Sequence, residues 1–303
     1  MSRNRLIAIT LVALAVAAAA VAQQQTDFSK IEIKTTQLAD GIYMMQGAGG
    51  NLGVSTGSDG VLLIDDQFAP LSDKIKAAIA KVSDKPVRFL FNTHYHGDHV
   101  GGNENFGKLP GITIVAHDNV WSRMSVEQVN TFFNRTTPPY PKEALPVVTF
   151  NDRLTFHLNG DTIEVFHVAP AHTDGDAILR FKKANVVHMG DTFFNGRYPI
   201  IDVFAGGSIA GMIAADERVL ALVNDQTKII PGHGPLGDKK SLQAFHDMMV
   251  KVRDRIAPMV KAGKSDSLIV AAKPTADFDA VWNPSGATPD RFVTAVAQGM
   301  RGR

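Results

Sequence analysis

The chain has 303 residues, of which 45% are hydrophobic and 20% are charged, a composition close to that of ordinary globular proteins that excludes disorder and collagen-like repeats. Without the two arginines of the N-terminal segment described next, the 31 basic residues fall to 29 against 30 acids, and this near-neutral charge offers no electrostatic footprint for nucleic acid. The absence of cysteine excludes a disulfide framework, a thiolate nucleophile, a cysteine zinc ligand and a lipidated cysteine anchor.

The N-terminus has the pattern of an export signal. Arg3 and Arg5 form a basic start, residues 6–21 form an apolar run without charge, and Ala20-Val21-Ala22 matches a small-x-small cleavage pattern. We therefore predict a signal peptide over residues 1–22 and export to a bacterial periplasm, so that the protein meets a membrane only during export. The alternative is an uncleaved anchor helix, which is disfavoured because much of the run is alanine and a span needs roughly 20 strongly apolar residues.

The first half of the mature chain alternates strands and helices. Apolar or β-branched runs separated by glycine-rich turns predict three strands joined as antiparallel hairpins. Apolar residues at helical spacing then predict a helix, and two buried strands and a second helix follow. The predicted strands cover residues 41–46, 51–56, 60–65, 87–92 and 112–116, and the predicted helices cover residues 70–82 and about 119–129.

The second half repeats this plan after a proline-rich segment. Residues 131–146 contain four prolines and are predicted to form an irregular, exposed connection. Short alternating runs separated by turn residues then predict further strands, followed by two helices with a buried strand between them. The strands cover residues 147–150, 153–158, 161–169, 177–182, 185–189 and 227–230, and the helices cover residues 211–223 and 241–262. Two sheets with outer helices are the simplest architecture for this pattern.

The chemistry is concentrated in His94-Tyr95-His96-Gly97-Asp98-His99, directly after a predicted strand. Three imidazoles and a carboxylate within six residues have the density of a metal site, because these are ordinary nitrogen and oxygen ligands of zinc. Alternation at positions 94, 96 and 98 lets an extended or turning backbone aim several side chains at one point. A solvated loop is the alternative, and the convergence of four potential ligands disfavours it.

Three more polar residues follow predicted strands in turn-like contexts. They are His172 in Ala171-His172-Thr173, Asp191 in Gly190-Asp191-Thr192, and His233 in Gly232-His233-Gly234. A sandwich of two sheets would gather such strand ends at one rim. Taken alone, each residue is more simply a packing, surface or turn residue.

The order His-x-His-x-Asp-His, a lone His, an Asp after Gly and a His within Gly-His-Gly resembles the metallo-β-lactamase superfamily over residues 41–234. The resemblance implies an α/β (α+β) fold, the αββα sandwich of two mixed sheets with outer helices. We expect one such domain over residues 23–303, with a helical C-terminal portion from about residue 241.

The resemblance also implies two Zn²⁺ ions per chain. His94, His96 and His172 would hold one ion, Asp98, His99 and His233 would hold the other, and Asp191 would bridge them. The best-known class B β-lactamases have cysteine or serine where Asp191 stands, whereas an aspartate there resembles glyoxalase II, lactonases and ribonuclease Z. Flavodiiron proteins have glutamate where His96 stands, which disfavours a redox di-iron site. Persulfide dioxygenases share the first metal's histidines and use one iron, so the identity of the metal stays open.

The expected mechanism is hydrolysis by a metal-bound hydroxide, since two divalent cations lower the pKa of water and polarise a scissile carbonyl. Asp98 is the predicted catalytic residue because its carboxylate can orient that hydroxide and pass a proton to the leaving group. Asp65 is a candidate for orienting a ligand histidine, with a plain turn residue as the equal alternative. In the segment 193–198, Asn195 could donate to an oxyanion and Arg197 could pair with a substrate carboxylate, with ordinary surface residues as the alternative.

Three classes of function fit these features. The first is a periplasmic zinc hydrolase that opens a small cyclic amide or ester, with β-lactams as the preferred small-molecule substrate because export places the enzyme where they act. The second is a lactonase or thioesterase with the same mechanism. The third is a non-enzymatic zinc-binding protein, which is disfavoured because all seven ligand positions are filled. The oligomeric state is left open by the sequence. The remaining histidines, which are given no chemical role, are His117, His157, His167, His188 and His246.

Overall fold

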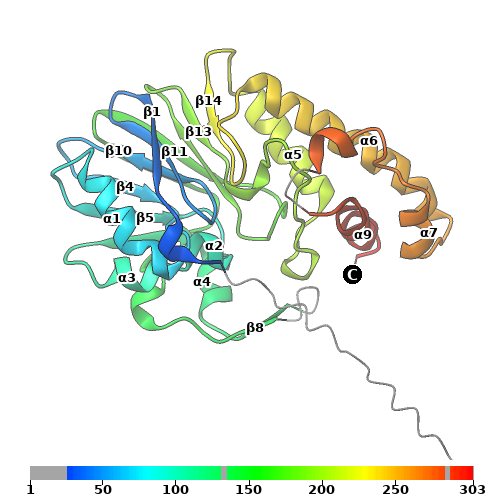
Figure 1. Cartoon of the computed structure of the whole chain (residues 1–303), viewed down its shortest axis with the longest axis horizontal. Helices are drawn as coiled ribbons and strands as arrows, with labels where there is room; N and C mark the ends of the chain where they lie inside the picture. The colour runs from blue at the N-terminus through cyan, green and yellow to red at the C-terminus, as the bar shows by residue number, and fades with distance from the viewer. Residues whose placement is uncertain (1–25, 131–134, 284–286, 303) are drawn as a thin grey trace, which may run out of the picture.

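The computed structural model describes residues 26–130, 135–283 and 287–302. The predicted signal peptide over residues 1–22 therefore lies outside the described residues. Within them, the chain forms two large β-sheets that pack face to face, with helices on both outer faces, as Figure 1 shows. This arrangement is the predicted architecture of two sheets with outer helices.

The first sheet has seven strands in the order β1-β2-β3-β4-β5-β6-β9. Strands β1, β2, β3 and β4 pair antiparallel in that order, which confirms the predicted hairpins. Strands β4, β5, β6 and β9 pair parallel in that order. Strand β1 is not predicted from the sequence, because it lies at the sheet edge and buries only Leu38. The strands are β1 (Lys34–Ala39), β2 (Ile42–Gln46), β3 (Leu52–Ser55), β4 (Val61–Ile64), β5 (Val87–Asn92), β6 (Thr113–His117) and β9 (Val148–Phe150).

The second sheet has five strands in the order β10-β11-β12-β13-β14. Its strands pair antiparallel except for β13 and β14, which are parallel. The strands are β10 (Arg153–Leu158), β11 (Asp161–His167), β12 (Ala177–Phe181), β13 (Val186–His188) and β14 (Lys228–Ile230).

Helices cover the outer face of each sheet (Figure 1). Those beside the first sheet are α1 (Ser72–Ala80), α3 (Asn103–Gly107) and α4 (Asp118–Met124), and those beside the second are α5 (Ile209–Leu220), α6 (Lys239–Lys261), α7 (Asp266–Ala271), α8 (Asp279–Trp282) and α9 (Pro289–Met300). Short 3₁₀ helices are η1 (Phe28–Lys30), η2 (Ala69–Leu71), η3 (Lys142–Ala144), η4 (Gly190–Thr192) and η5 (Val203–Ala205). None of the described helices is both long and apolar enough to cross a membrane.

Period-two alternation in the strands supplies separate hydrophobic cores. In β4, Leu62 and Ile64 pack into the core between the two sheets, whereas Val61 and Leu63 pack with Ile75 of α1. Both faces of β4 are therefore buried, which explains why all four of its residues are apolar. A further core lies between the second sheet and helices α5, α6 and α9. The layers follow in the order helix, sheet, sheet, helix.

Two predictions in the middle of the chain are corrected by the structure. The helix predicted over residues 119–129 ends at Met124, and β7 (Gln128–Asn130) follows it. The apolar residues Val126 and Val129, which extend the helical pattern in the sequence, are 53% and 60% exposed and belong to no core. The segment 131–146, predicted to be irregular, contains η3 and β8 (Arg135–Thr137), which pairs with β7. Its prolines all follow β8, so they do not interrupt the pairing.

Strand direction brings the predicted site residues to one edge. Because β4 and β5 are parallel, Asp65 and His94 follow their carboxyl ends on the same side of the first sheet. In the second sheet β11, β13 and β14 all run in one direction. The turns after these three strands contain His172, Asp191 and His233, which therefore also share an edge.

A fully buried carboxyl group interrupts the apolar core beside α5. Asp216 lies on the buried face of this helix, and neither of its side-chain oxygens has a hydrogen-bond partner within the described part of the chain. Burial first, and the nearby charge of Glu217 second, raise the pKa of the Asp216 carboxyl well above its usual range. Burial therefore favours the neutral acid form of this group in the folded protein.

We expect Asp216→Leu to raise the free energy of unfolding by about 1–3 kcal/mol near pH 7, the usual cost of an unpaired buried polar group. The pKa of Asp216 is higher in the folded state than in the unfolded state. The parent's free energy of unfolding is therefore undiminished by this group below the unfolded pKa of about 3.9, and it declines as the pH rises toward the folded pKa. In urea unfolding, the variant's advantage should therefore grow from about pH 4 to about pH 7. Ala214→Leu, at an exposed position of the same helix, is the control. An equal gain in that control would contradict the assignment.

Candidate metal centre

The structure brings all seven predicted ligands together where the strand ends meet. They form overlapping groups in which the potential ligand atoms all lie within 4.8 Å of one another. The groups are His94, His96 and His172, then His94, His99 and Asp191, then Asp98, His99 and His233.

The loop after β5 positions four of these side chains. His94 follows the strand, and the backbone is still extended at His96, with φ −66° and ψ 144°. Helix α2 (Gly97–Val100) then begins, so the alternation expected over positions 94, 96 and 98 holds only as far as His96. The helical turn aims Asp98 and His99 instead.

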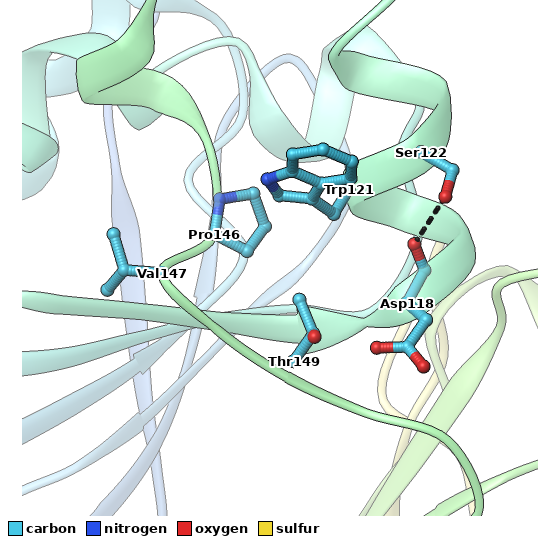
Figure 2. Close-up of a pocket in the computed structure, with 6 residues that line it drawn as sticks. All are labelled: Asp118, Trp121, Ser122, Pro146, Val147 and Thr149. Atoms are coloured by element: carbon cyan, nitrogen blue, oxygen red, sulfur yellow. Dashed lines mark hydrogen bonds between the residues drawn. The ribbon is translucent and has the colours of Figure 1, made fainter.

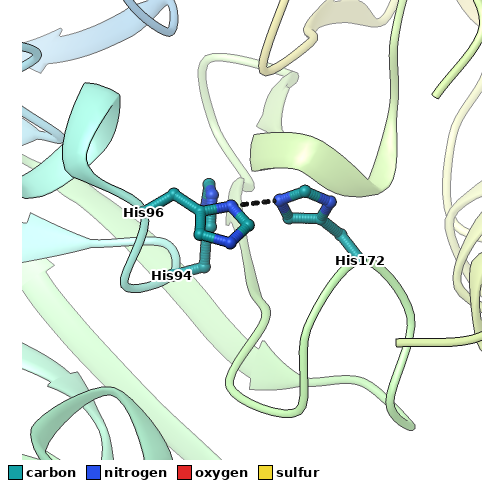
Figure 3. A group of neighbouring side chains, drawn as sticks. All are labelled: His94, His96 and His172. Atoms are coloured by element: carbon teal, nitrogen blue, oxygen red, sulfur yellow. Dashed lines mark hydrogen bonds between the residues drawn. The ribbon is translucent and has the colours of Figure 1, made fainter. Parts of the chain in front are cut away.

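The first group consists of three imidazoles in close contact, shown in Figure 3. The rings of His94, His96 and His172 are 4.6 to 4.9 Å apart between centroids and nearly perpendicular. His96 Nδ1 and His172 Nε2 are 2.7 Å apart. Burial lowers the pKa of His94 well below its usual range and that of His172 to about 4. These two rings are therefore neutral near pH 7, and neutral imidazole is the form that binds metal.

Asp98, His99 and His233 form the group that is called the second group from here on, and it combines two imidazoles with a carboxylate. His233 Nε2 lies 3.2 Å from Asp98 Oδ2 and 3.4 Å from His99 Nε2. Burial lowers the pKa of His233, but the charges of Asp191 and Asp98 outweigh it and raise the pKa to about 9. A cation that binds here therefore has to replace a proton.

Asp191 lies between the two groups and faces both. Its Oδ1 is 3.1 Å from His99 Nε2, and its Oδ2 is 3.4 Å from the Nε2 atoms of both His172 and His233. His94 Nε2 is buried without a hydrogen-bond partner among the described residues, and the buried Asp191 Oδ1 has the His99 contact but no well-aligned hydrogen bond among them. Unpaired buried acceptors of this kind are costly unless a cation satisfies them. The donor set therefore fits bound divalent metal.

Two glycines allow the close approach of backbone to these ligands. A Cβ atom at Gly232 would stand 1.9 Å from Asp191 Oδ1, and one at Gly50 would stand 2.1 Å from the His99 ring. Any larger residue at either position would displace a ligand. The glycine before His233 in the sequence motif thus makes room for Asp191.

Asp65 holds the outer sides of two ligand histidines. Its Oδ2 is 2.7 Å from His99 Nδ1 and accepts a hydrogen bond from the Thr93 hydroxyl at 2.8 Å. The Thr93 oxygen lies 3.1 Å from His94 Nδ1. In both rings this leaves Nε2 as the ligand atom. The sequence places Asp65 as a candidate for this role, and the structure puts it there.

Two residues in the structure's polar network have no signal in the sequence. The Asn51 amide donates to the carbonyls of Pro231 at 2.8 Å and Gly234 at 3.0 Å, and so clamps the turn that contains His233. Asp202 Oδ2 lies 2.9 Å from His96 Nε2. Neither residue belongs to a local motif, because its partner lies more than a hundred positions away in the chain.

The two predicted substrate contacts have different environments. The Asn195 amide donates to the carbonyls of Pro235 and Leu236 at 3.0 and 3.3 Å, so it fixes the loop, and its contact with an oxyanion stays a prediction. Arg197 is half-buried and makes no hydrogen bond or ion pair with any described residue. Burial lowers the pKa of its guanidinium, and the charge of Asp191 opposes that shift.

The other histidines lie outside the metal-binding groups found among the described residues. His188 is buried, with Nε2 3.1 Å from the Asn51 carbonyl and Nδ1 accepting from the Gly190 N–H at 3.2 Å. Both of its nitrogens are satisfied by backbone, as in a packed core histidine. His117 and His167 stack on each other with centroids 3.8 Å apart, away from the ligands.

A surface hollow of about 300 Å³ lies elsewhere, between α4 and the start of β9, as Figure 2 shows. Trp121 and Pro146 face each other in it, and the Ser122 hydroxyl donates to the Asp118 carbonyl at 3.1 Å. None of the seven candidate ligands lines this hollow. The metal-binding groups, not this hollow, are therefore the candidate active site.

Comparison with known proteins adds to this geometry. Residues 49–234 match the sequence model of the metallo-beta-lactamase superfamily, and this stretch covers more than half of the chain and all seven candidate ligands. The chain belongs to the metallo-beta-lactamase superfamily. The three side-chain groups that could hold a metal ion all lie within the matched residues.

Curated relatives within the superfamily have diverse names. The hydroxyacylglutathione hydrolase of Pelagibacter ubique is 26% identical over 57% of this chain and 63% of its own length. The 2,4-dinitroanisole O-demethylase subunit alpha of Nocardioides sp. is 27% identical over 58% of this chain and 50% of its own length. A probable metallo-hydrolase of Bacillus subtilis is 27% identical over 58% of this chain and 84% of its length. The chain thus spans only half to two thirds of the first two relatives.

Solved structures confirm the fold. A metallo-beta-lactamase from Pontibacter korlensis has a TM-score of 0.58 with 17% identity, covering 72% of this chain and 99% of that protein. The DIM-1 metallo-beta-lactamase has a TM-score of 0.59 with 16% identity, covering 73% of this chain and 99% of that protein. The predicted αββα sandwich is therefore confirmed, while at these identities the likeness concerns the fold alone.

Proposed function

We propose that this superfamily hydrolase holds two zinc ions and uses them to open a small amide or ester. The observation that carries the proposal is the position of Asp191, whose two oxygens lie within 3.4 Å of ligand nitrogens from both groups. A buried carboxylate with imidazoles on both sides is a donor set typical of zinc. Seven ligands also exceed the four or five that one zinc ordinarily uses.

Asp98 is the residue that we assign to proton transfer in this hydrolysis. Divalent cations, when bound, activate water and polarise a carbonyl near neutral pH. The side chain of Asp98 is 30% exposed and that of Asp191 is 4% exposed, so Asp98 is the carboxylate that substrate and the attacking water can reach. Burial raises the pKa of Asp98, but His99 and His233 outweigh it and keep the pKa well below its usual range. Asp98 is therefore ionised near neutral pH, and its role as the carboxylate that orients the attacking water and relays a proton to the leaving group rests on its position and exposure.

The environment of Arg197 indicates which chemical group the substrate carries. The half-buried Arg197 guanidinium has no hydrogen-bond or ion-pair partner within the described residues, and the charge of Asp191 acts on it, so it is available to an anionic ligand. Guanidinium groups bind carboxylates through two parallel hydrogen bonds. We infer that the substrate carries a carboxylate that Arg197 binds while the metal centre opens a bond nearby.

Two substrate classes fit the metal centre, and within each class the inferred Arg197 contact favours members that carry a carboxylate. A β-lactam is the first, because the predicted export signal would place the enzyme in the periplasm, where β-lactams act. A thioester or lactone is the second, and the similarity to hydroxyacylglutathione hydrolases favours it. In either case we propose a small-molecule substrate, no nucleic-acid partner, and contact with the membrane only during export. A zinc-binding protein without activity is the remaining class.

Metal analysis and a substrate panel test the proposal together. After zinc saturation, elemental analysis of the purified protein should find about two equivalents, because seven ligands exceed the needs of one ion. Nitrocefin, an acyl homoserine lactone and a small carboxylated thioester are then assayed with zinc and with a chelator, and chelation should abolish turnover of at least one of them. One equivalent at saturation would contradict the dinuclear site, and no turnover by the two-zinc protein would contradict enzymatic function.

A variant of Arg197 extends the same panel. Arg197→Gln should raise KM for nitrocefin and the carboxylated thioester by roughly 10-fold or more, the value of a hydrogen bond to a charged group. KM for the acyl homoserine lactone, which has no carboxylate, should not change. Equal effects on all substrates would rule out the carboxylate contact.

A further inference from the structure

A buried aspartate outside the ligand set contacts the first metal-binding group. Asp202 Oδ2 lies 2.9 Å from His96 Nε2, and the side chain of Asp202 is only 1% exposed. On the opposite side of the ring, His96 Nδ1 is 2.7 Å from His172 Nε2. The imidazole of His96 therefore lies between a carboxylate and the ligand group, with Nδ1 facing the ligands.

The carboxylate of Asp202 is itself held from several sides. The Tyr95 hydroxyl donates to the same Oδ2 atom at 2.9 Å, and the Ala205 N–H donates to Oδ1 at 3.1 Å. The Tyr95 ring stacks under Arg123, which forms a two-bond ion pair with Asp174 at 2.6 and 2.7 Å. These contacts fix both oxygens of Asp202.

The same short segment also holds the second histidine of the pair. The Ile200 carbonyl lies 2.7 Å from His172 Nδ1, and the Asp202 N–H donates to the His172 carbonyl at 2.9 Å. Because Ile200 takes the Nδ1–H of His172, the free acceptor of that ring is Nε2. Residues 200–202 thus contact, in both His96 and His172, the ring nitrogen that faces away from the other ligand histidine.

We propose that Asp202 is a positioning residue of the first metal site, which accepts the Nε2–H of His96 and so makes Nδ1 its ligand atom. His94, His99 and His172 instead present Nε2, because Thr93, Asp65 and Ile200 contact their Nδ1 atoms. A carboxylate on the outer nitrogen of a ligand histidine fixes the tautomer and the ring orientation and increases the basicity of the ligand. The inference rests on the proposed two-metal function.

Titration of the metal-free full chain with Co²⁺ tests the proposal, with parent, Asp202→Ala, Asp202→Asn and Asp216→Asn compared. The parent should bind two Co²⁺ ions, and Asp202→Ala should weaken one of the two by about 10- to 100-fold. Asp202→Asn should weaken the same ion by a smaller factor, because a neutral acceptor makes a weaker bond than a carboxylate. Asp216→Asn, which changes a buried carboxyl outside the three candidate ligand groups, should bind both ions like the parent.

Histidine tautomers provide a readout that general destabilisation would not move. Long-range ¹H–¹⁵N spectra of the zinc-loaded parent should show one ligand histidine bound through Nδ1, and Asp202→Ala should lose that signal pattern. Unchanged affinity for both Co²⁺ ions, or unchanged tautomers, would overturn the role of Asp202. If Asp202→Ala fails to fold, Asp202→Asn decides, and parent-like affinity in that variant overturns the proposal. A parent that binds no Co²⁺ would instead overturn the proposed function.

Discussion

Asp191→Ala is expected to lower kcat/KM by about 10³-fold and to leave the protein with one tightly bound zinc. The carboxylate lies 3.1 Å from His99 Nε2 and 3.4 Å from His172 Nε2, and so joins the two groups. Without it, the second site keeps only Asp98, His99 and His233 as ligands. The loss of one cation removes several kcal/mol of stabilisation from the charged transition state, which corresponds to the expected fall in rate.

Steady-state kinetics on the best substrate of the panel and zinc analysis of the same sample measure this effect. Asp191→Asn is the matched control, since it keeps the size of the side chain and removes its charge. It should lie between parent and Asp191→Ala in both measurements. An alanine variant that keeps two zinc ions and parental activity would show that Asp191 does not bridge the metals.

Asp191→Cys separates metal binding from substrate preference. The thiolate resembles the ligand of many class B β-lactamases, and a softer sulfur suits zinc while it no longer spans both ions. If the aspartate limits β-lactam turnover, the exchange should raise β-lactamase activity relative to lactonase or thioesterase activity. An unchanged ratio with both metals bound would locate the substrate preference elsewhere, with the loop around Arg197 as the next candidate.

Asp98→Asn is expected to lower kcat by roughly 10²- to 10⁴-fold, the usual contribution of general acid–base catalysis. An amide at this position no longer accepts the proton of the attacking water. Zinc at the first site should be retained, because His94, His96 and His172 are unchanged. The reduction in turnover should therefore greatly exceed any change in first-site occupancy.

His94→Ala is the matched comparison for Asp98→Asn. It removes a ligand that lies in both the first group and the group around Asp191, so it should lower zinc content together with activity. Zinc analysis beside kinetics distinguishes the two variants. Full turnover by a zinc-loaded Asp98→Asn sample would show that the proton is handled by another group.

Local patterns were sufficient to predict most elements of the sandwich. The strands β5 and β10 have the predicted bounds, because an apolar run between turn residues is a local signal. The edge strand β1 and the hairpin of β7 and β8 were not predicted. Edge strands bury few side chains, so their residues follow no clear apolar pattern.

The sequence by itself determined which residue types could bind metal, since His94, His96, Asp98 and His99 stand in one short motif after a strand. Only the tertiary structure decided how the groups assemble, because their contacts join distant parts of the chain. His96 meets His172 across 76 positions, and His99 meets His233 across 134 positions. Asp202 reaches His96 across 106 positions with no motif around it. The direction of parallel and antiparallel strands, which sets where each strand ends, is the physical reason that these side chains share one edge.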